Sequence, residues 1–261
     1  MSILGKIVAR KREEVAVLRK LYPRGFAPEV LAASRGPRRS LRAALASGPA
    51  PRIIAEVKKA SPSAGLLRPD FFPVELAREY AAAGAAAISV VTDRDFFQGE
   101  LEWVTAIRKA VPLPVLRKEF IIDPLQLEET RAAGADAVLL IAAILSPKEL
   151  RSLLERAAEL DLECLVEVRD EDDVTKLREA KPELVGINNR DLKDFSIDLE
   201  TSLVIARQLP AGVVVVSESG IETRADIERL RAGGINAFLI GTSLVRAADR
   251  GRLLGELIDG A

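Results

Sequence analysis

The chain has 261 residues, of which 48% are hydrophobic, and its formal net charge is −1. These values exclude a disordered chain and argue against nucleic acid or an anionic membrane as the main partner. The sequence contains no histidine and a single cysteine, Cys164, which excludes an internal disulfide, the Ser–His and Cys–His catalytic systems, and nearly every zinc or non-haem iron site. An enzyme of this composition must therefore use lysine, glutamate, aspartate, tyrosine or Cys164 as its acids and bases.

Three helical patterns occupy residues 1–50, at 3–21, 28–33 and 41–46. This extension either closes the bottom or side of the domain that follows or covers an active site, and the sequence favours neither alternative. The first residues lack the pattern of a signal peptide, and the longest apolar stretches, 81–91 and 137–145, are too short to span a bilayer as helices. We therefore expect a cytoplasmic protein that is not bound to a membrane.

Short apolar runs alternate with helical patterns along the rest of the chain. The predicted strands are residues 53–57, 87–91, 114–117, 137–141, 163–168, 184–187, 213–216 and 237–240. The predicted helices are 73–83, 101–110, 124–133, 147–160, 171–180, 199–208 and 224–232, with a closing helix at 250–258. This alternation indicates an α/β fold with a parallel sheet covered by helices.

A repeated small-residue pattern supports the same architecture. It is centred on Gly84, Gly134 and Gly234, with a helical pattern before each glycine and an apolar run after it. Glycine suits the end of a helix because it tolerates the left-handed conformation there. Eight strand–helix units predict a single (βα)8 TIM barrel over residues 1–261, in which residues 1–50 form a helical N-terminal extension. A doubly wound open sheet is the structural alternative.

Polar residues leave six of the predicted strands. The active site of a barrel lies at the carboxyl ends of its strands, so these residues are the first candidates for chemistry. Glu56 and Lys58 lie on one face of their strand because side chains alternate with a period of two. Glu167 lies within an apolar strand and needs a cation or a chemical purpose, and Lys118 is its natural partner. For Lys59, Glu119 and Asn189, a solvated strand end or a salt bridge is the simpler interpretation.

Two glycine-containing loops predict a phosphate site. Ser219 and Gly220 follow the seventh predicted strand, and Gly241 and Thr242 follow the eighth. Barrels often bind phosphate at these two loops, where backbone N–H groups are free at the start of a helix. Lys58 could supply a cation to this phosphate. Neither a Walker A sequence nor a GxGxxG fingerprint after a strand is present, so we expect no nucleotide cofactor.

Five segments resemble the indole-3-glycerol phosphate synthase family: residues 54–63 (IAEVKKASPS), 116–121 (LRKEFI), 165–168 (LVEV), 186–192 (GINNRDL) and 217–221 (SESGI). The likeness covers essentially the whole chain, and its first and fourth segments are highly specific. The resemblance implies a carboxy-lyase of tryptophan biosynthesis that converts 1-(2-carboxyphenylamino)-1-deoxyribulose 5-phosphate into indole-3-glycerol phosphate, with no cofactor and no metal. Association with other tryptophan-pathway enzymes is left open.

The resemblance also implies chemical roles. Lys118 is the general acid at the ketone oxygen, and Glu167 is the general base of the dehydration. We expect a nearby cation or partial burial to make Lys118 a better proton donor. Lys58 is a second acid that also contacts the phosphate, with the division of work between the two lysines left open. Glu56 orients the lysines or assists at the amine nitrogen, and Glu218 supports the network.

The remaining site residues bind the substrate by the same resemblance. The substrate carboxylate and hydroxyls are assigned to Asn188, Arg190 and Ser219. The phosphate is assigned to Gly220, Gly241 and Thr242. The pocket for the aromatic ring is assigned to Phe97, Phe120 and Leu139, with Pro62, and Ser61 is a further substrate-binding residue. Core packing is an equal alternative for Phe97 and Leu139, and the loop 61–70 is a candidate lid.

Two other functions fit a phosphate-binding barrel. Isomerases of amino-acid biosynthesis commonly use a Cys–Asp or Asp–Asp pair, whereas the first predicted strand here ends in Glu-Val-Lys. A non-catalytic phosphosugar-binding or scaffolding barrel would bind ligand without turnover. The presence of both Lys118 and Glu167 argues against this second function.

Overall fold

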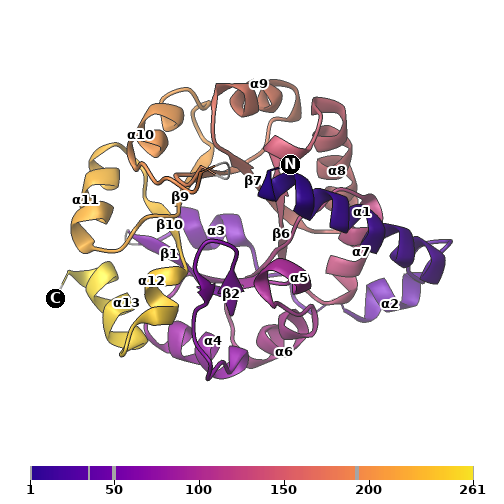
Figure 1. The fold of residues 1–261 in the computed structure, drawn as a ribbon, viewed down its shortest axis with the longest axis horizontal. Coiled ribbons are helices and arrows are strands. Elements are labelled where there is room, and N and C mark those ends of the chain that lie inside the picture. The colour runs from indigo at the N-terminus through magenta and orange to yellow at the C-terminus, as the bar shows by residue number, and fades with distance from the viewer. Residues whose placement is uncertain (1, 35, 49–50, 192–193, 261) are drawn as a thin grey trace.

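Eight parallel strands form a closed barrel in the order β1-β10-β9-β8-β7-β6-β5-β4, which confirms the predicted (βα)8 fold and excludes the open sheet (Figure 1). The computed structural model describes residues 2–34, 36–48, 51–191 and 194–260, so Leu192, at the end of the fourth matching segment, lies outside it. The strands are β1 (Arg52–Val57), β4 (Ala87–Val91), β5 (Val115–Lys118), β6 (Ala137–Ile141), β7 (Glu163–Val168), β8 (Leu184–Asn188), β9 (Val214–Glu218) and β10 (Ala237–Ile240).

A ring of helices surrounds the barrel (Figure 1). The helices between strands are α4 (Pro73–Ala82), α6 (Glu102–Ala110), α7 (Pro124–Ala132), α8 (Pro147–Glu159), α9 (Glu171–Ala180), α10 (Glu200–Ala206) and α11 (Arg224–Ala232). Two more helices follow the last strand, α12 (Thr242–Arg246) and α13 (Arg250–Asp259). The predicted strands, and all the predicted helices between and after them, differ from these bounds by two residues or fewer. Gly241 and the short α12 form the second of the two glycine-containing loops identified from the sequence.

Three short features in the loops after strands were not predicted: a hairpin, a one-turn helix and a 3-10 turn. β2 (Ala60–Ser61) and β3 (Gly65–Leu66) form an antiparallel hairpin after β1, α5 (Arg94–Phe97) follows β4, and the 3-10 turn η1 (Ala142–Ile144) follows β6. Elements of two to four residues are too short to show a helical or strand period. All three lie on the side of the barrel where the strands end, so they shape the surroundings of the site.

The alternation of side chains along the strands separates an apolar layer from a charged one. Among the strands that place apolar side chains in the cluster inside the barrel, β1, β5, β7 and β9 do so with Ile54, Leu116, Leu165 and Val216. Two positions later, and therefore on the same inward face, each of these strands carries a charged residue: Glu56, Lys118, Glu167 and Glu218. The apolar layer fills the barrel core, and the next layer toward the carboxyl ends brings the charges together.

The N-terminal extension divides between the two ends of the barrel, so both alternatives for it are correct in part. α3 (Leu41–Ala46) closes the amino end, where Leu41 and Leu45 join the interior cluster and Arg52 Nε donates to the Ala44 carbonyl over 2.9 Å. α1 (Ile3–Leu21) crosses the opposite face (Figure 1). The short α2 (Pro28–Ala33) links them along the side, against α7.

Leu41 makes the closing role of α3 testable. The side chain is fully buried among the interior residues of the barrel, so Leu41→Ala removes apolar contacts and leaves a cavity. We expect the free energy of unfolding to fall by about 2–5 kcal/mol, as measured by urea denaturation. Leu21→Ala is the matched control, because Leu21 is 68% exposed and its truncation should change stability by less than about 0.5 kcal/mol. Equal effects of the two changes would contradict the role given to α3.

Candidate active site

One pocket opens at the carboxyl ends of the strands, and it gathers the residues proposed from the sequence. It is lined by all of them except Glu218, which is buried behind the pocket wall: Glu56, Lys58, Ser61, Pro62, Phe97, Lys118, Phe120, Leu139, Glu167, Asn188, Arg190, Ser219, Gly220, Gly241 and Thr242. The sequence reasoning missed the part of the wall that α1 supplies, namely Ile3, Leu4 and Ile7. Their apolar spacing at the start of a helix shows a buried face, but it does not show what covers that face.

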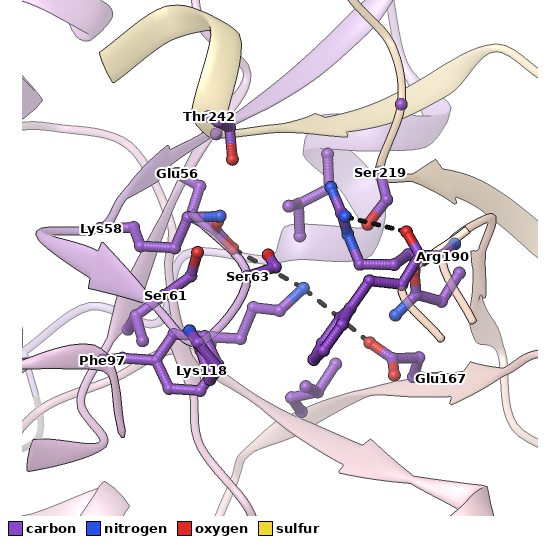
Figure 2. A pocket seen from close by; sticks show the side chains of 18 of the residues that line it. Glu56, Lys58, Ser61, Ser63, Phe97, Lys118, Glu167, Arg190, Ser219 and Thr242 are labelled. Carbon is purple, nitrogen blue, oxygen red and sulfur yellow. Dashed lines mark hydrogen bonds and ion pairs between the residues drawn. The ribbon is translucent and has the colours of Figure 1, made fainter. Parts of the chain in front are cut away.

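Lys118 lies in the middle of the charged layer. Its Nζ is 2.6 Å from Glu218 Oε2, 3.6 Å from Glu56 Oε2 and 3.9 Å from Glu167 Oε2. Figure 2 shows the Lys118 side chain between Glu56 and Glu167, which lie on opposite sides of it. Each of the four side chains comes from a different strand, so the closed barrel itself sets these distances.

The surroundings of Lys118 differ from our expectation. We expected a nearby cation or partial burial to make this lysine a better donor. Burial does disfavour its charged form, but the negative charges of Glu218, Glu56 and Glu167 outweigh burial, and the pKa of Lys118 lies above its ordinary value. The side chain is therefore protonated throughout the neutral range. Neighbouring carboxylates stabilise its charged form, which is the opposite of the effect expected from a nearby cation.

Glu56 connects the two lysines of the pocket. Its Oε1 is 2.6 Å from Lys58 Nζ, while its Oε2 faces Lys118. Burial opposes ionisation of this carboxyl, yet Lys58 and Lys118 outweigh burial and lower the pKa of Glu56. At neutral pH Glu56 is thus an anion that fixes both ammonium groups.

Glu167 has the opposite character. Burial raises the pKa of its carboxyl to about 7, the charge of Glu218 adds to this effect, and Lys118 offsets only part of it. The carboxylate lies 3.9 Å from Lys118, farther than either of the other two glutamates. A carboxyl with a pKa near neutrality can accept a proton and release it again, which suits a general base.

The two glycine loops lie side by side because β9 and β10 are neighbours. Ser219 and Gly220 both have positive φ angles, 69° and 78°, a conformation that costs energy for serine and not for glycine. Asn189 holds this turn from the outer side of the barrel, where its Nδ2 donates to Ser217 Oγ and to the Ser219 carbonyl, each over 3.0 Å, and its Oδ1 accepts from Ser202 of α10. Asn189 is therefore a buried support for the loop, and the solvated strand end that we considered for it is wrong.

An aromatic wall faces away from these loops. Phe97 in α5 and Phe120 after β5 have ring centroids 6.0 Å apart with planes inclined by 41°. In Figure 2, Phe97 lies on one side of Lys118 while Thr242 and Ser219 lie on another. Leu139 serves both functions considered for it, since it belongs to the barrel core and also lines the pocket. The pocket thus has an apolar end, a charged centre and an end lined by backbone turns.

Two glycines leave space for the carboxylates of the centre. A Cβ at Gly186 would lie 2.1 Å from Glu218 Oε1, and a Cβ at Gly241 would lie 2.4 Å from Glu56 Oε1. Gly186 was not among the residues proposed from the sequence. The available signal was a glycine inside a strand at an inward position, two residues before Asn188, where glycine marks close approach of another group.

The chain is similar to known proteins over nearly its whole length. The family model for indole-3-glycerol phosphate synthase matches residues 4–257. The chain is 51% identical over 258 residues to the indole-3-glycerol phosphate synthase of Desulfotalea psychrophila, with 98% of each chain covered. It is 47% identical over 251 residues to that of Rhodopirellula baltica, covering 95% of this chain and 96% of the relative. The chain belongs to the indole-3-glycerol phosphate synthase family. Membership places it among the carboxy-lyases of tryptophan biosynthesis.

A solved structure shares the fold alone. The crystal structure of 3-hexulose-6-phosphate synthase superposes with a TM-score of 0.63 at 19% identity, covering 79% of this chain and 97% of the other. Across the described residues of this family member, no helix is long and apolar enough to cross a membrane. The same residues contain no group of three or more acidic or cysteine side chains placed to hold a metal ion.

Gly186→Ala tests the packing behind Lys118. The added methyl group must displace the Glu218 carboxylate and weaken its ion pair with Lys118, because both are held in the barrel core. We expect the free energy of unfolding to fall by about 1–3 kcal/mol, measured by denaturant unfolding. Gly255→Ala, in α13 with open space around the glycine, is the control and should be neutral or stabilising. A Gly186→Ala variant as stable as the parent would show that Glu218 moves freely.

Proposed function

We propose that this chain catalyses the decarboxylating ring closure and dehydration of 1-(2-carboxyphenylamino)-1-deoxyribulose 5-phosphate to indole-3-glycerol phosphate. The observation that carries the proposal is the lysine at the centre of the pocket, within 3.9 Å of three glutamates. One of those glutamates has a pKa of about 7. A protonated donor and a titrating acceptor in one pocket suit a reaction that needs an acid and a base in succession.

The three regions of the pocket match the three parts of this substrate. The aryl ring is assigned to the apolar end, formed by Phe97, Phe120, Leu139 and Pro62, with Ser61 beside it. The phosphate is assigned to the backbone turns at Gly220, Gly241 and Thr242, with Lys58 as the cation. The substrate carboxylate and hydroxyls are assigned to Asn188, Arg190 and Ser219. This placement leaves the ketone carbon beside Lys118.

Ring closure needs an acid at the ketone oxygen. As the aryl carbon attacks the ketone carbon, Lys118 donates a proton and the oxygen becomes a hydroxyl. The bond to the carboxyl carbon then breaks, carbon dioxide leaves, and the bonding electrons return to the ring. The three carboxylates make Lys118 a weaker acid at rest, so the proton moves only once attack has made the ketone oxygen basic.

Dehydration completes the indole. The hydroxyl leaves as water after it takes a proton, for which Lys58 is the proposed acid, and Glu167 removes a proton from the adjacent ring carbon. Glu56 holds both lysines, and Glu218 holds Lys118 from behind, so neither carboxylate needs to react itself. Association with other tryptophan-pathway enzymes stays a prediction, which co-purification of the full chain with those enzymes would test.

Incubation of the protein with the carboxyphenylamino substrate tests the proposed function directly, because the indole product fluoresces. An isomerase would consume no such substrate, and a non-catalytic barrel would bind it without forming product. Absence of indole fluorescence from correctly folded protein would therefore reject the proposal.

Lys118→Met is expected to lower turnover by at least about 100-fold, the usual size of an acid–base contribution, because it removes the proton donor but keeps an unbranched side chain. Steady-state kinetics of indole formation, with circular dichroism to verify folding, measure the effect. Lys59→Met is the matched control, because Lys59 follows Lys58 in the chain but does not line the pocket. The turnover of this variant should stay near that of the parent. Near-normal turnover of Lys118→Met would remove Lys118 from the acid role.

The raised pKa of Glu167 predicts that kcat/KM falls on the acidic side of its pH profile. A base must be deprotonated, and a pKa of about 7 means that the active form is lost as the pH falls through neutrality. We expect kcat/KM to decrease about tenfold per pH unit below that value. Glu167→Gln should slow dehydration, so that the ring-closed intermediate accumulates in single-turnover experiments, and the residual turnover should lack this acidic limb of the profile. A limb that persists in Glu167→Gln would place the base elsewhere.

A further inference from the structure

The N-terminal helix carries a buried lysine. Lys11 in α1 is only 2% exposed, and its Nζ lies 2.9 Å from Asp93 Oδ2, 3.0 Å from Glu119 Oε1 and 2.8 Å from Glu14 Oε2. Lysine is almost never buried unless it is paired, because removing its charge from water is costly. Apolar side chains alone would suffice to pack a helix against the barrel, and α1 has such side chains in Ile7 and Val15. We therefore expect the role of Lys11 to lie in the carboxylates with which it forms ion pairs.

Two of the three carboxylates around Lys11, those of Asp93 and Glu119, hold the backbone of the aromatic wall. Asp93 Oδ1 accepts hydrogen bonds from the N–H groups of Phe96 and Phe97, over 2.8 and 3.1 Å, and so caps α5. Glu119 Oε1 accepts from the N–H of Phe120 over 2.9 Å. The backbones of Phe97 and Phe120, two phenylalanines that line the pocket, are thus each one hydrogen bond away from a carboxylate paired with Lys11.

Asp93 depends on Lys11 more than Glu119 does. In the described part of the chain, Asp93 Oδ2 is buried and has no hydrogen-bond partner beyond its ion pair with Lys11. Glu119 has further partners, since its Oε2 accepts from Thr92 over 2.7 Å and lies 3.8 Å from Arg117. Loss of the Lys11 charge would leave Asp93 as an uncompensated anion next to Glu119.

We propose that Lys11 is a positioning residue, which sets the aromatic wall of the pocket from the N-terminal extension by holding the carboxylates that anchor Phe97 and Phe120. The inference rests on the proposed function only in naming the ligand of that wall as an aryl ring. Two other ion pairs also tie α1 to the barrel, Arg10 with Asp95 and Arg19 with Asp123. Both arginines are substantially exposed, and Asp95 and Asp123 accept no hydrogen bond from the backbone of Phe97 or Phe120.

Lys11→Met is the primary variant. With the anchor charges uncompensated, we expect KM for the carboxyphenylamino substrate to rise about tenfold at about pH 8, with kcat changed less than about threefold. The wall contacts the ring equally in the bound and reacting states, so uniform binding is what it loses. An unchanged KM, or a loss confined to kcat, would overturn the proposal.

The pH dependence separates a charge effect from lost packing. The charged groups around the site are Lys11 and Glu14 from α1, Asp93 before α5, Arg117 and Glu119 at the end of β5, and Glu129 from α7. Without Lys11 the buried carboxylates take up protons more readily, which removes their charge and keeps one oxygen of each as an acceptor. The ratio of variant to parent KM should return to within about threefold at about pH 6. A ratio that does not change with pH would contradict the proposal.

Two further variants keep the test decisive. Lys11→Met/Asp93→Asn removes the uncompensated charge but retains a good N-cap for α5, so its KM at about pH 8 should lie within about threefold of the parent value. Val15→Ala loosens the same buried face of α1 without touching either carboxylate, and it should leave KM unchanged. Failure of the double variant to recover, or an equal KM increase in Val15→Ala, would overturn the proposal.

Hydrogen exchange distinguishes failure of this inference from failure of the proposed function. It needs no turnover, and it reports the backbone amides of Phe97 and Phe120 directly. In Lys11→Met we expect both amides to exchange at least about tenfold faster, after correction for intrinsic rates, while amides of β8 keep the parent rate. This result would stand even if the parent formed no indole product. Unchanged exchange at both amides would reject the positioning role.

Discussion

The ammonium group of Lys118 is surrounded by three carboxylates inside a closed ring of strands, and the rest of the site is arranged around that charge. A cation removed from water is stable only beside anions, and here Glu218, Glu56 and Glu167 provide them from three different strands. Because one cation cannot neutralise three anions, the glutamates compete. Glu56 also has Lys58 and stays ionised, whereas Glu167 is the most distant and has a raised pKa.

This competition gives Glu56 and Glu167 different pKa values in a chain that contains no histidine. Lys118 has a raised pKa and Glu167 has a pKa of about 7, and they lie 3.9 Å apart, which is why we propose them as the acid and the base. The different behaviour of the two glutamates comes from position, since Glu167 and Glu56 are the same residue type at equivalent depths in the barrel. The close packing of Gly186 against Glu218 and of Gly241 against Glu56 keeps these two carboxylates in place, which is consistent with the supporting roles proposed for them.

The fold and the charged centre were predictable because they follow from local periodicity. A period of two along β1 and β5 places Glu56 and Lys118 one step beyond Ile54 and Leu116 on the inward face, and eight repeated units close the sheet. The parts that were not predictable depend on long-range contacts. The reduced acidity of Lys118 depends on glutamates from three other strands. The buried Lys11 contacts Asp93 and Glu119, which lie more than eighty positions later in the chain. The short α5 shows no period at all.

The extension joins the stable end of the barrel to its reactive end. α3 fills the amino end with leucines, where packing alone matters, while α1 reaches the carboxyl end with a buried charge. The two attachments differ in kind for a physical reason. Apolar contacts tolerate small displacements, whereas an ion pair with hydrogen-bonded carboxylates fixes direction as well as distance. A charged contact therefore suits the proposed task of holding Phe97 and Phe120 in one orientation, and the ion pairs of Lys11 with Asp93 and Glu119 provide such a contact at the end of the barrel where the pocket opens.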